Sequence, residues 1–545
     1  MASIYDKSSL VLIPSGTKTG KVYSQKPVSG DGDFTFTRAS AATRVNADGF
    51  IEKERGNRML NSNDFNQWAK LTNGTYTITT ETITDPFGNS VSLAKVTLTS
   101  GTYLVLRGYE PVQINEVTTA SVYVKKTNAT THFEIDINDA YNKVAQNNTD
   151  WQRVVSTNYS TGYFLDISVS TLNQPVYIAY AQMESGLVAT DYIPTTSAPV
   201  YVGITDNVPR LDYTDSSCPA LLLEPQRTNL FPHSEYFADW ITDAGEVLTA
   251  NSIQSPEGVL NGYTLTLTNG AYQLNVYDRI SITSGVDYVF SVWLKKKNTN
   301  QVQIYQYSIN APSGFVSRAT IDFDAGTITD VDGSGATIEP YENGWFRCSV
   351  KCNAPSTLMQ NGILTATIGV ADVYAYGAQA ELGSYATSYI PTYGSSVTRV
   401  NDGSLSLPIS QTLNDFTLYW EGSLLQDGQN MLFGGGTGGW YLDVTGSNGR
   451  IVLDTNTGRK YQAFSTLRTG QTHKVAMKRT NGVIDAFVDG VKLTPTTQVT
   501  DTTALSLVSI VWSFSSTYYP KMNLNQVLTM QSALTDQEAI DLTTI

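Results

Sequence analysis

The chain has 545 residues, of which 41% are hydrophobic and 15% are charged, so it carries enough apolar surface for several packed cores and is not expected to be disordered. Its 35 basic and 49 acidic residues give a net charge of −14, which argues against binding of a nucleic-acid backbone. The three cysteines exclude a disulfide framework, and no apolar run approaches the roughly 20 residues of a membrane-spanning helix, so no membrane insertion is expected.

Residues 1–56 read as a separate piece that anchors the protein or mediates oligomer contacts. They contain one predicted hairpin, in which a strand is followed by the turn Ala47-Asp48-Gly49 and then by Phe50 to Glu52. The string TRVN at 43–46 recurs at 398–401, each time at the edge of a repeat unit, and indicates a junction element.

The middle of the chain is duplicated. NRMLNSNDFNQW at 57–68 matches NLFPHSEYFADW at 229–240, and QMESGLVATDYIPT at 182–195 matches QAELGSYATSYIPT at 379–392. Between them SVYVKK matches SVWLKK and DWQRV matches GWFRC. The offset grows from 170 to 194 residues between these two inner blocks, which predicts an inserted strand, turn and strand in the second copy around residues 321–335.

The hydrophobic period within each copy is two, and short alternating runs are broken by Gly, Asn, Asp and Pro. This pattern predicts an all-β, multidomain protein with two tandem jelly-roll β-sandwiches, at 57–200 and 229–397, joined by an ordered connector at 201–228. Residues 398–545 are also strand-rich and form a third predicted sandwich.

Turn and cap signals mark the third sandwich. Asn481-Gly482 and Asp489-Gly490 predict two hairpin turns, and Thr535 with Glu538 forms the capping box of a short helix. Cys348 and Cys352 are expected to be buried thiols. The tryptophans at 68, 151, 240, 345, 420 and 512 are expected to be core residues.

Two strings carry a resemblance to a known family. FTFTRASAATRVNADGFIE at 34–52 and RLDYTDSSCPALLLEPQRTNL at 210–230 resemble segments of bacteriophage virion proteins, fibres or appendages of crass-like and related phages of Bacteroidota. In those proteins such strings precede jelly rolls that are similar to carbohydrate-binding modules. HKVAMKRTNGVIDAFVDGVKL at 473–493, followed by ALTDQEAI, resembles the LamG or concanavalin A-like sandwich.

The resemblance implies a non-enzymatic structural virion protein, a head or tail fibre or appendage on the exposed surface of the particle. Its implied partners are itself, as a homodimer or homotrimer, other virion proteins through the N-terminal segment, and host-surface or mucus glycans. In this interpretation residues 398–545 form the distal, host-facing end. The alternatives are a capsid decoration protein without glycan binding and a glycan-degrading fibre enzyme.

No catalytic constellation is recognised, and no cofactor is expected. The three histidines, His132, His233 and His473, have no partner that the sequence assigns, so each is expected to be structural. Acidic clusters with oxygen ligands of the kind that Ca²⁺ prefers are better explained by turns than by a metal site. They comprise Asp136, Asn138 and Asp139 in the first copy and Asp322, Asp324, Asp330 and Asp332 in the second.

Sugar binding is the site chemistry that the composition favours, because exposed aromatic rings stack on pyranose rings. The candidate residues are Trp440 and Tyr441, next to the glycine-rich 434–439, and Tyr518 and Tyr519. For these four rings a glycan contact and a subunit interface stay open as alternatives, because aromatic residues are enriched in both.

Overall fold

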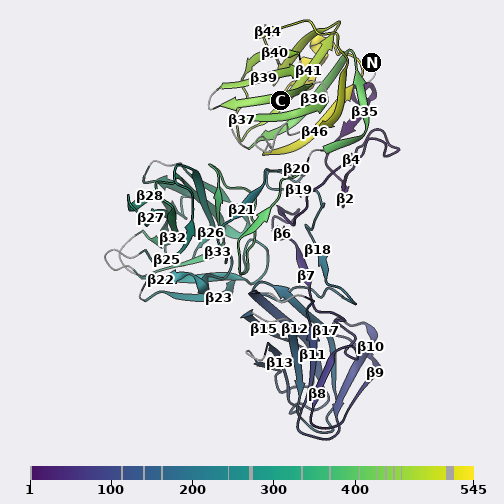
Figure 1. Ribbon diagram of the computed structural model, residues 1–545, viewed down its shortest axis with the longest axis vertical. Helices are drawn as coiled ribbons and strands as arrows, with labels where there is room; N and C mark the ends of the chain where they lie inside the picture. Colours follow the sequence, from purple (N-terminus) through teal and green to yellow (C-terminus); the bar gives the residue numbers. More distant parts are fainter. Residues whose placement is uncertain are drawn as a thin grey trace.

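The computed structural model is almost entirely β and contains three β-sandwiches, as predicted (Figure 1). The structure describes residues 3–111, 115–138, 142–160, 164–243, 245–268, 274–332, 335–366, 370–403, 405–425, 428–435, 438–445, 448–455, 457–510 and 521–545.

The first jelly roll packs two five-stranded sheets around one core. One sheet has the order β15-β12-β17-β10-β9 and the other β14-β13-β16-β11-β8. The strands are β8 (Ala69–Thr72), β9 (Tyr76–Thr84), β10 (Ser90–Leu98), β11 (Leu104–Tyr109), β12 (Glu116–Lys126), β13 (Phe133–Ile137), β14 (Asn142–Val144), β15 (Gln152–Ser160), β16 (Phe164–Val169) and β17 (Val176–Ser185). Alternate residues such as Val122 and Val124 face the core, which is why the sequence period is two.

The second jelly roll has the same plan with six strands in each sheet, in the orders β22-β25-β32-β27-β28-β29 and β23-β24-β33-β26-β31-β30. Its elements are 3₁₀-helices η1 (Phe237–Asp239) and η2 (Glu342–Gly344), and strands β22 (Ile241–Thr242), β23 (Val247–Ile253), β24 (Gly262–Thr268), β25 (Val276–Ser281), β26 (Asp287–Lys296), β27 (Gln301–Ser308), β28 (Gly314–Asp322), β29 (Thr327–Asp330), β30 (Ala336–Pro340), β31 (Phe346–Asn353), β32 (Leu358–Thr365) and β33 (Val370–Leu382). The predicted insertion is confirmed, because β29 and β30 are the additional pair and extend one sheet each.

The motifs shared by the two copies form the same buried hydrogen bonds. The Asn57 amide donates to the carbonyls of Ala181 and Ile193, at 3.0 and 2.8 Å, and accepts from the Met59 and Met183 amides. Asn229 repeats all four bonds in the second copy. These bonds tie the entering segment to the last strand, so the repeated strings are explained by architecture.

The third sandwich is assembled from three separate parts of the chain. Its first sheet has the order β19-β20-β46-β36-β41-β42-β43, with β1 also on β46, and its second has the order β2-β3-β4-β35-β45-β37-β38-β39-β40-β44. The strands are β1 (Leu10–Leu12), β2 (Thr17–Lys18), β3 (Lys21–Val22), β4 (Phe34–Thr35), β19 (Leu211–Asp212), β20 (Ala220–Leu223), β35 (Leu405–Leu413), β36 (Phe416–Leu424), β37 (Gly428–Gly435), β38 (Gly438–Thr445), β39 (Asn448–Thr455), β40 (Gly458–Ser465), β41 (Thr472–Thr480), β42 (Val483–Val488), β43 (Val491–Lys492), β44 (Pro495–Gln498), β45 (Leu505–Ile510) and β46 (Met522–Met530).

This assembly corrects the interpretation of residues 1–56 as a separate piece. It also shows that the ordered connector 201–228 contributes β19 and β20 to the third sandwich. β20 pairs with residues 522–524 of β46 and β1 with 527–529, so both segments lie end to end along one edge of that strand. The apolar side chains of Leu10, Leu12 and Leu221 are buried in the core of the third sandwich. Burying them there removes apolar surface from water and closes a sheet edge.

Each jelly roll is therefore an insertion into the third sandwich, joined to it by a neck of two paired strands. The first neck pairs β7 (Arg55–Asn57) with β18 (Val200–Val202), and the second pairs β21 (Arg227–Asn229) with β34 (Val397–Arg399). In Figure 1 the third sandwich lies at the top with both marked ends of the chain, and the two jelly rolls lie below it.

A buried cluster of charges lies where the three chain segments meet. Asp402 pairs with Arg38 at 2.9 Å and with Arg210, while Glu224 pairs with Arg210 at 2.7 Å and Arg399 at 3.1 Å. All five side chains are at most 1% exposed. We call these five residues the junction cluster.

The remaining expectations for local structure are met. The hairpin of β5 (Thr43–Val45) and β6 (Ile51–Lys53) forms around Gly49, and turns at Asn481-Gly482 and Asp489-Gly490 join β41, β42 and β43. Helix α2 (Asp536–Thr543) has the Thr535 capping box, and it lies beside the short α1 (Ile4–Lys7), with Lys7 paired to Glu538. Among the described residues, no helix has the length and apolar character to cross a bilayer.

The burial expectations are met in most positions. Cys348 and Cys352 are buried, and so are Trp68, Trp240, Trp345 and Trp420. Trp151 is only half-buried, and Trp512 lies outside the described residues.

Replacing Asp402 with Asn is expected to destabilise the protein by about 3–5 kcal/mol, because three buried guanidinium groups would keep a single carboxylate. Burial alone would raise the pKa of Asp402, but Arg210, Arg38 and Arg399 lower it below its ordinary value. A lowered carboxylate pKa contributes stability that is complete above the unfolded pKa of about 4 and is lost as the pH falls through the folded pKa. Urea unfolding between pH 7 and 3 should therefore show a smaller pH dependence in the variant. The matched change of exposed Asp48 to Asn should leave the free energy of unfolding and its pH dependence unchanged. Equal effects of the Asp402 and Asp48 changes would contradict the role of the junction cluster.

Candidate functional site

Two of the four predicted sugar-binding aromatics, Trp440 and Tyr441, are buried. Trp440 is 0% exposed and Tyr441 is 6% exposed, whereas Tyr518 and Tyr519 lie outside the described residues. The expected exposure of Trp440 and Tyr441 is therefore wrong.

The physical reason is the position of β38 inside a ten-stranded sheet, where the side chains of Trp440 and Tyr441, on its two faces, are both buried. Trp440 points into the sandwich core and packs on Tyr461, with ring centroids 5.9 Å apart. Tyr441 lies on the other face and donates its hydroxyl to Asp454 at 2.8 Å, and Arg459 donates to the same hydroxyl. For the glycine-rich string the sequence leaves both a flexible loop tip and a close backbone approach open. Gly434 pairs with Gly439 across β37 and β38, and residues 436–437 between the two strands lie outside the described residues.

The histidines occupy structural positions. His473 contacts Asp489 at 2.7 Å through Nδ1 and accepts the Arg468 amide through Nε2, which fixes the turn at Asp489. His233 lies 3.2 Å from Asp239, and its backbone carbonyl accepts from the Trp240 indole. His132 is part-exposed and lies 3.4 Å from Glu134.

The acidic clusters form turns. Asp322 accepts the backbone amides of Asp324 and Ala325, and Asp330 accepts those of Asp332 and Gly335. The side chain of Asn138 accepts the Phe164 amide, and Asp139 lies outside the described residues. In the described part of the chain, no group of three or more acidic, histidine or cysteine side chains is arranged to hold a metal ion.

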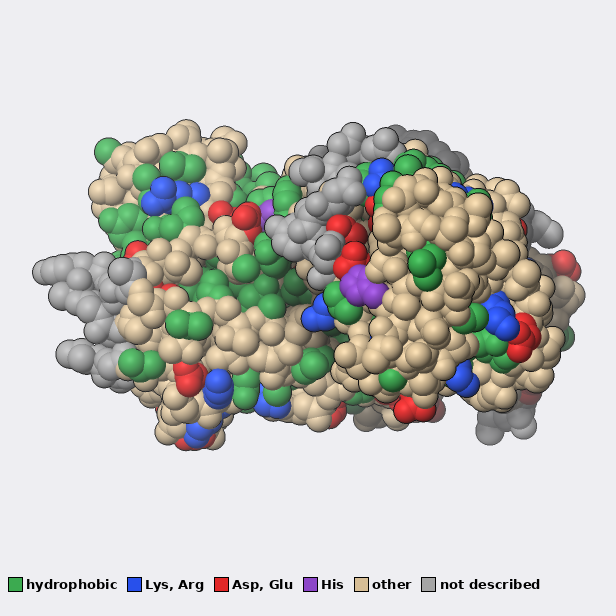
Figure 2. All heavy atoms as spheres, turned by 90° about the horizontal axis from the view of Figure 1, so that it is seen from below, with side chains coloured by type: hydrophobic (Ala, Val, Ile, Leu, Met, Phe, Trp, Pro, Cys, Tyr) green, Lys and Arg blue, Asp and Glu red, His purple; other side chains and the backbone are tan. Residues whose placement is uncertain are grey.

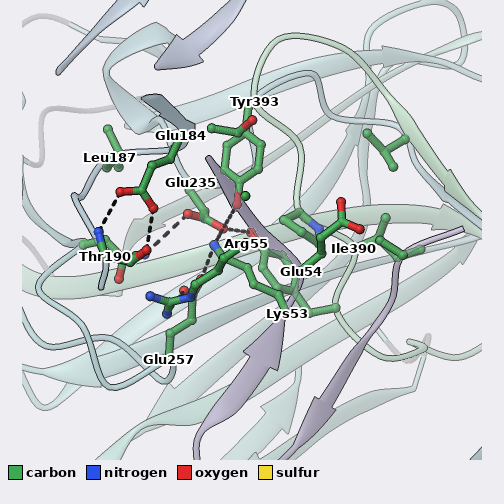
Figure 3. Close-up of a pocket in the computed structure, with 18 of the residues that line it drawn as sticks. Lys53, Glu54, Arg55, Glu184, Leu187, Thr190, Glu235, Glu257, Ile390 and Tyr393 are labelled. Carbon is green, nitrogen blue, oxygen red and sulfur yellow. Dashed lines mark hydrogen bonds and ion pairs between the residues drawn. The ribbon is translucent and has the colours of Figure 1, made fainter. Parts of the chain in front are cut away.

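A cavity of about 220 Å³ lies between the two jelly rolls and the β6–β7 segment (Figure 3). Lys53 points from β6 toward two carboxylates of the second jelly roll, 2.8 Å from Glu235 and 2.5 Å from Glu257. The hydroxyls of Tyr389 and Tyr393 donate to Glu235 at 3.1 and 3.2 Å.

Burial and charge act against each other in this cluster. Burial raises the pKa of Glu235, and the opposing effect of Lys53 is too small to restore its ordinary value. Burial would also raise the pKa of Glu257, but Lys53 and Arg55 together lower it. Burial would lower the pKa of Lys53, yet the two glutamates raise it. The ammonium is thus held charged, as a bridge between the carboxylates.

Two carboxylates with different pKa values suggest acid–base chemistry, but their surroundings favour a clamp. The side chains of Glu235 and Glu257 are 1% exposed, and the Lys53 ammonium occupies the space between them. A glycosidase needs that space for the scissile bond. The cluster therefore fastens the β5–β6 hairpin to the second jelly roll.

An aromatic face lies on the outside of the β22-β25-β32-β27-β28-β29 sheet of the second jelly roll. Tyr305 and Tyr307 project from β27 on the side opposite the core residues Val302 and Ile304. Tyr305 is fully buried there, and Tyr307 is half-buried. The ring of Phe315 lies 5.3 Å from Tyr307 and 5.5 Å from Tyr305, and is 38% exposed.

Polar groups hold these rings in place. Gln360 on β32 donates to the Tyr305 hydroxyl at 3.0 Å, and that hydroxyl donates to the Leu274 carbonyl. The Arg279 guanidinium donates to Gln360 and is exposed, and that of Arg318 lies over the Phe315 ring, 4.5 Å from its centroid. Rings fixed in this way beside hydrogen-bonding groups can stack on a sugar and bind its hydroxyls.

The sequence carried a signal for this face that was not used. In QVQIYQYS at 301–308, Gln303, Tyr305 and Tyr307 alternate with Val302, Ile304 and Gln306, so the period of two places the tyrosines on the side away from the core. Which strands lie beside them follows only from the long-range register.

Comparisons with protein-family models and with curated proteins find no match. Among solved structures, the CBM22-1–CBM22-2 tandem domain of Paenibacillus barcinonensis Xyn10C is similar at 12% identity over 60% of this chain and 98% of that one, with a TM-score of 0.22. Trypanosoma rangeli sialidase in complex with sialic acid is similar at 11% identity, over 98% of this chain and 96% of that one, with a TM-score of 0.20. The LG1-3 region of the laminin alpha2 chain is similar at 10% sequence identity, over 78% of this chain and 94% of that one, with a TM-score of 0.17. At these TM-scores the likenesses carry no argument about activity.

Replacing Lys53 with Met is expected to destabilise the protein by about 3–5 kcal/mol, because two buried carboxylates would lose their shared cation. The stability difference between the variant and the unchanged protein should decrease as the pH falls toward 4, because protonated carboxyl groups are neutral and are not stabilised by the ammonium. Urea unfolding at pH 7 and pH 4 measures both effects. Lys297, which is part-exposed, gives the matched control, and a change of Lys297 to Met should cost less than about 1 kcal/mol.

Proposed function

We propose that this protein is a non-enzymatic glycan-binding structural protein, a head or tail fibre or appendage on the surface of a bacteriophage particle. The observation that carries the glycan-binding part is the part-exposed pair of rings Tyr307 and Phe315, which packs over the buried Tyr305 and is bordered by the exposed Arg279.

Two features support this face as a sugar contact. Its rings are fixed by hydrogen bonds and a stacked guanidinium, so little side-chain entropy is lost on binding. The exposed Arg279 guanidinium beside the rings offers donors that match sugar hydroxyls. On the face of the molecule that Figure 2 shows, the side chains of Lys, Arg, Asp and Glu are scattered in small groups.

The virion part rests on the resemblance of the strings at 34–52 and 210–230 to phage virion proteins. In this structure both strings supply the junction cluster, through Arg38, Arg210 and Glu224. They therefore mark the framework that holds the three sandwiches together, as expected of a structural protein that presents binding modules.

The arrangement revises which end faces the host. An anchor within residues 1–56 and a distal third sandwich do not fit together, because β1 to β4 are strands of that sandwich. If residues 1–56 attach to the particle, the third sandwich lies next to it and the jelly rolls point outward (Figure 1).

The two alternatives predict different behaviour. A decoration protein without glycan binding would leave the aromatic face without a ligand, and a glycan-degrading enzyme would release oligosaccharide from host capsule. The burial of Glu235 and Glu257 around Lys53 favours binding over hydrolysis.

The full-length protein is expected to bind glycans on an array of host capsular and mucus glycans, and a Tyr307→Ala, Phe315→Ala double variant is expected to lose about tenfold or more in affinity for at least one of them. Tyr103→Ala, Leu172→Ala is the matched control, since both side chains are exposed in the first jelly roll. Binding equal to the unchanged protein in the double variant would remove this face from the proposal.

Immuno-gold labelling of intact particles tests the virion assignment. Antibody against residues 57–200 should place gold farther from the particle surface than antibody against residues 405–543. A uniform coat with both antibodies would favour decoration, and labelling only after disruption of the particle would contradict an exposed appendage.

A further inference from the structure

The first jelly roll carries a group of aromatic rings on the outside of its β15-β12-β17-β10-β9 sheet. Phe87 lies 5.5 Å from Tyr123 and 5.6 Å from Tyr180, and Tyr180 lies 4.7 Å from Tyr192, all between ring centroids. The ring of Phe87 is 57% exposed, and the other three are part-exposed. We call these four residues the aromatic patch.

The second jelly roll has a corresponding place, which the strand registers identify. Tyr123 pairs with Arg153 and Ala179, and Trp293 pairs with Arg347 and Tyr376 in the same way. The hydroxyl of Tyr192 bonds to Ser62 as that of Tyr389 does to Ser234. The turn at Asp85–Gly88 corresponds to that at Ser255–Gly258, with the same backbone hydrogen bonds and positive φ at both glycines.

In the second jelly roll this place is filled by the chain itself. Ile51 of β6 packs against Trp293, Tyr376 and Tyr389, and its amide donates to the Pro256 carbonyl at 2.8 Å. Lys53, two residues later, reaches Glu257. The three rings are consequently only 1–2% exposed, and the place serves as a socket for the β5–β6 hairpin.

Three replacements remove that socket from the first jelly roll. Phe87 occupies the position of Glu257 in the second copy, and Asn63 occupies that of Glu235. The first jelly roll therefore lacks both carboxylates that pair with Lys53 in the second. Tyr180, with a φ of 61°, stands where the second copy has Gly377, with a φ of 60°. A Cβ at Gly377 would lie 3.0 Å from the Trp293 ring, whereas Tyr180 fills the same space with its own ring.

The result is a preformed aromatic surface. Asp85, which is 4% exposed, accepts the Tyr180 hydroxyl at 2.8 Å and the amides of Phe87 and Asn89. Arg153 lies over the Tyr123 ring, 5.4 Å from its centroid, and is held by the Ser121 hydroxyl and the Thr190 carbonyl. Both the rings and the polar groups beside them are therefore fixed before any ligand arrives.

We propose that the aromatic patch is a second glycan-contact surface, which takes the apolar face of a pyranose ring on Phe87 and Tyr180, with Arg153 at its border. The proposal rests on the glycan-binding function proposed above and adds a site on the other jelly roll and on the opposite sheet. Two modules that each bind a sugar weakly would together hold a polymeric glycan far more tightly.

The size of the patch favours a sugar over a protein partner. A stable protein interface buries about 800 Å² on each side, with a core of several apolar side chains. Of the large hydrophobic side chains that are exposed among the described residues of the first jelly roll, only Phe87 belongs to the patch; the others are Leu71, Tyr103, Tyr109, Val144 and Leu172. A single pyranose ring needs one or two aromatic faces.

The test uses the full-length protein on the same array of host capsular and mucus glycans. Phe87→Ala is expected to weaken binding to at least one glycan by about fivefold or more, because the stacking face is lost. Leu71→Ala, an exposed apolar side chain on the opposite sheet, is the matched control and should bind as the unchanged protein does.

The outcomes separate this proposal from the one on which it rests. If the unchanged protein binds, the Tyr307→Ala, Phe315→Ala variant loses binding and Phe87→Ala does not, the patch is no glycan site and the proposed function stands. If the unchanged protein binds no glycan, both proposals fail. If Phe87→Ala leaves glycan binding intact but abolishes self-association in light scattering, the patch is a protein interface and the sugar proposal is overturned.

Discussion

The pairing of three arginines with two carboxylates in the junction cluster is the interaction on which the architecture depends. Arg38 comes from the N-terminal segment, Arg210 and Glu224 from the segment between the jelly rolls, and Arg399 and Asp402 from the segment after the second one. Charges that are at most 1% exposed are tolerated only when every partner is in place, because an isolated buried ion costs several kcal/mol. The cluster therefore couples the folding of segments that lie hundreds of residues apart.

Local patterns in the sequence were sufficient for much of the fold. The duplication, the inserted pair β29 and β30, the hairpin turns and the capped helix α2 are all signalled by short strings, and all are present. The shared strings of the two copies also have a physical explanation, because residues such as Asn57 and Asn229 satisfy the same buried backbone groups.

The interleaving of the third sandwich was not predicted, since no local pattern specifies it. Leu10 pairs with Thr529, and Leu221 pairs with Leu524, and such partners share no sequence signal. The exposure expected of Trp440 and Tyr441 is wrong for a similar reason, whereas Tyr518 and Tyr519 lie outside the described residues. The glycine-rich string before Trp440 gives no sign that β38 lies between β37 and β39 inside the sheet. Exposure of an aromatic residue is a property of the register, and the register is set by distant partners.

The two necks have a mechanical consequence. Inside the third sandwich β1 pairs with β46, and residue 10 lies opposite residue 529. Force between these two residues can therefore pass directly across the strand pair and through neither jelly roll. Tension applied between these two strands would act on the third sandwich alone. Each jelly roll is attached to that sandwich by its own pair of strands and would bear none of the tension. The two jelly rolls are in this way isolated from tension borne by the third sandwich.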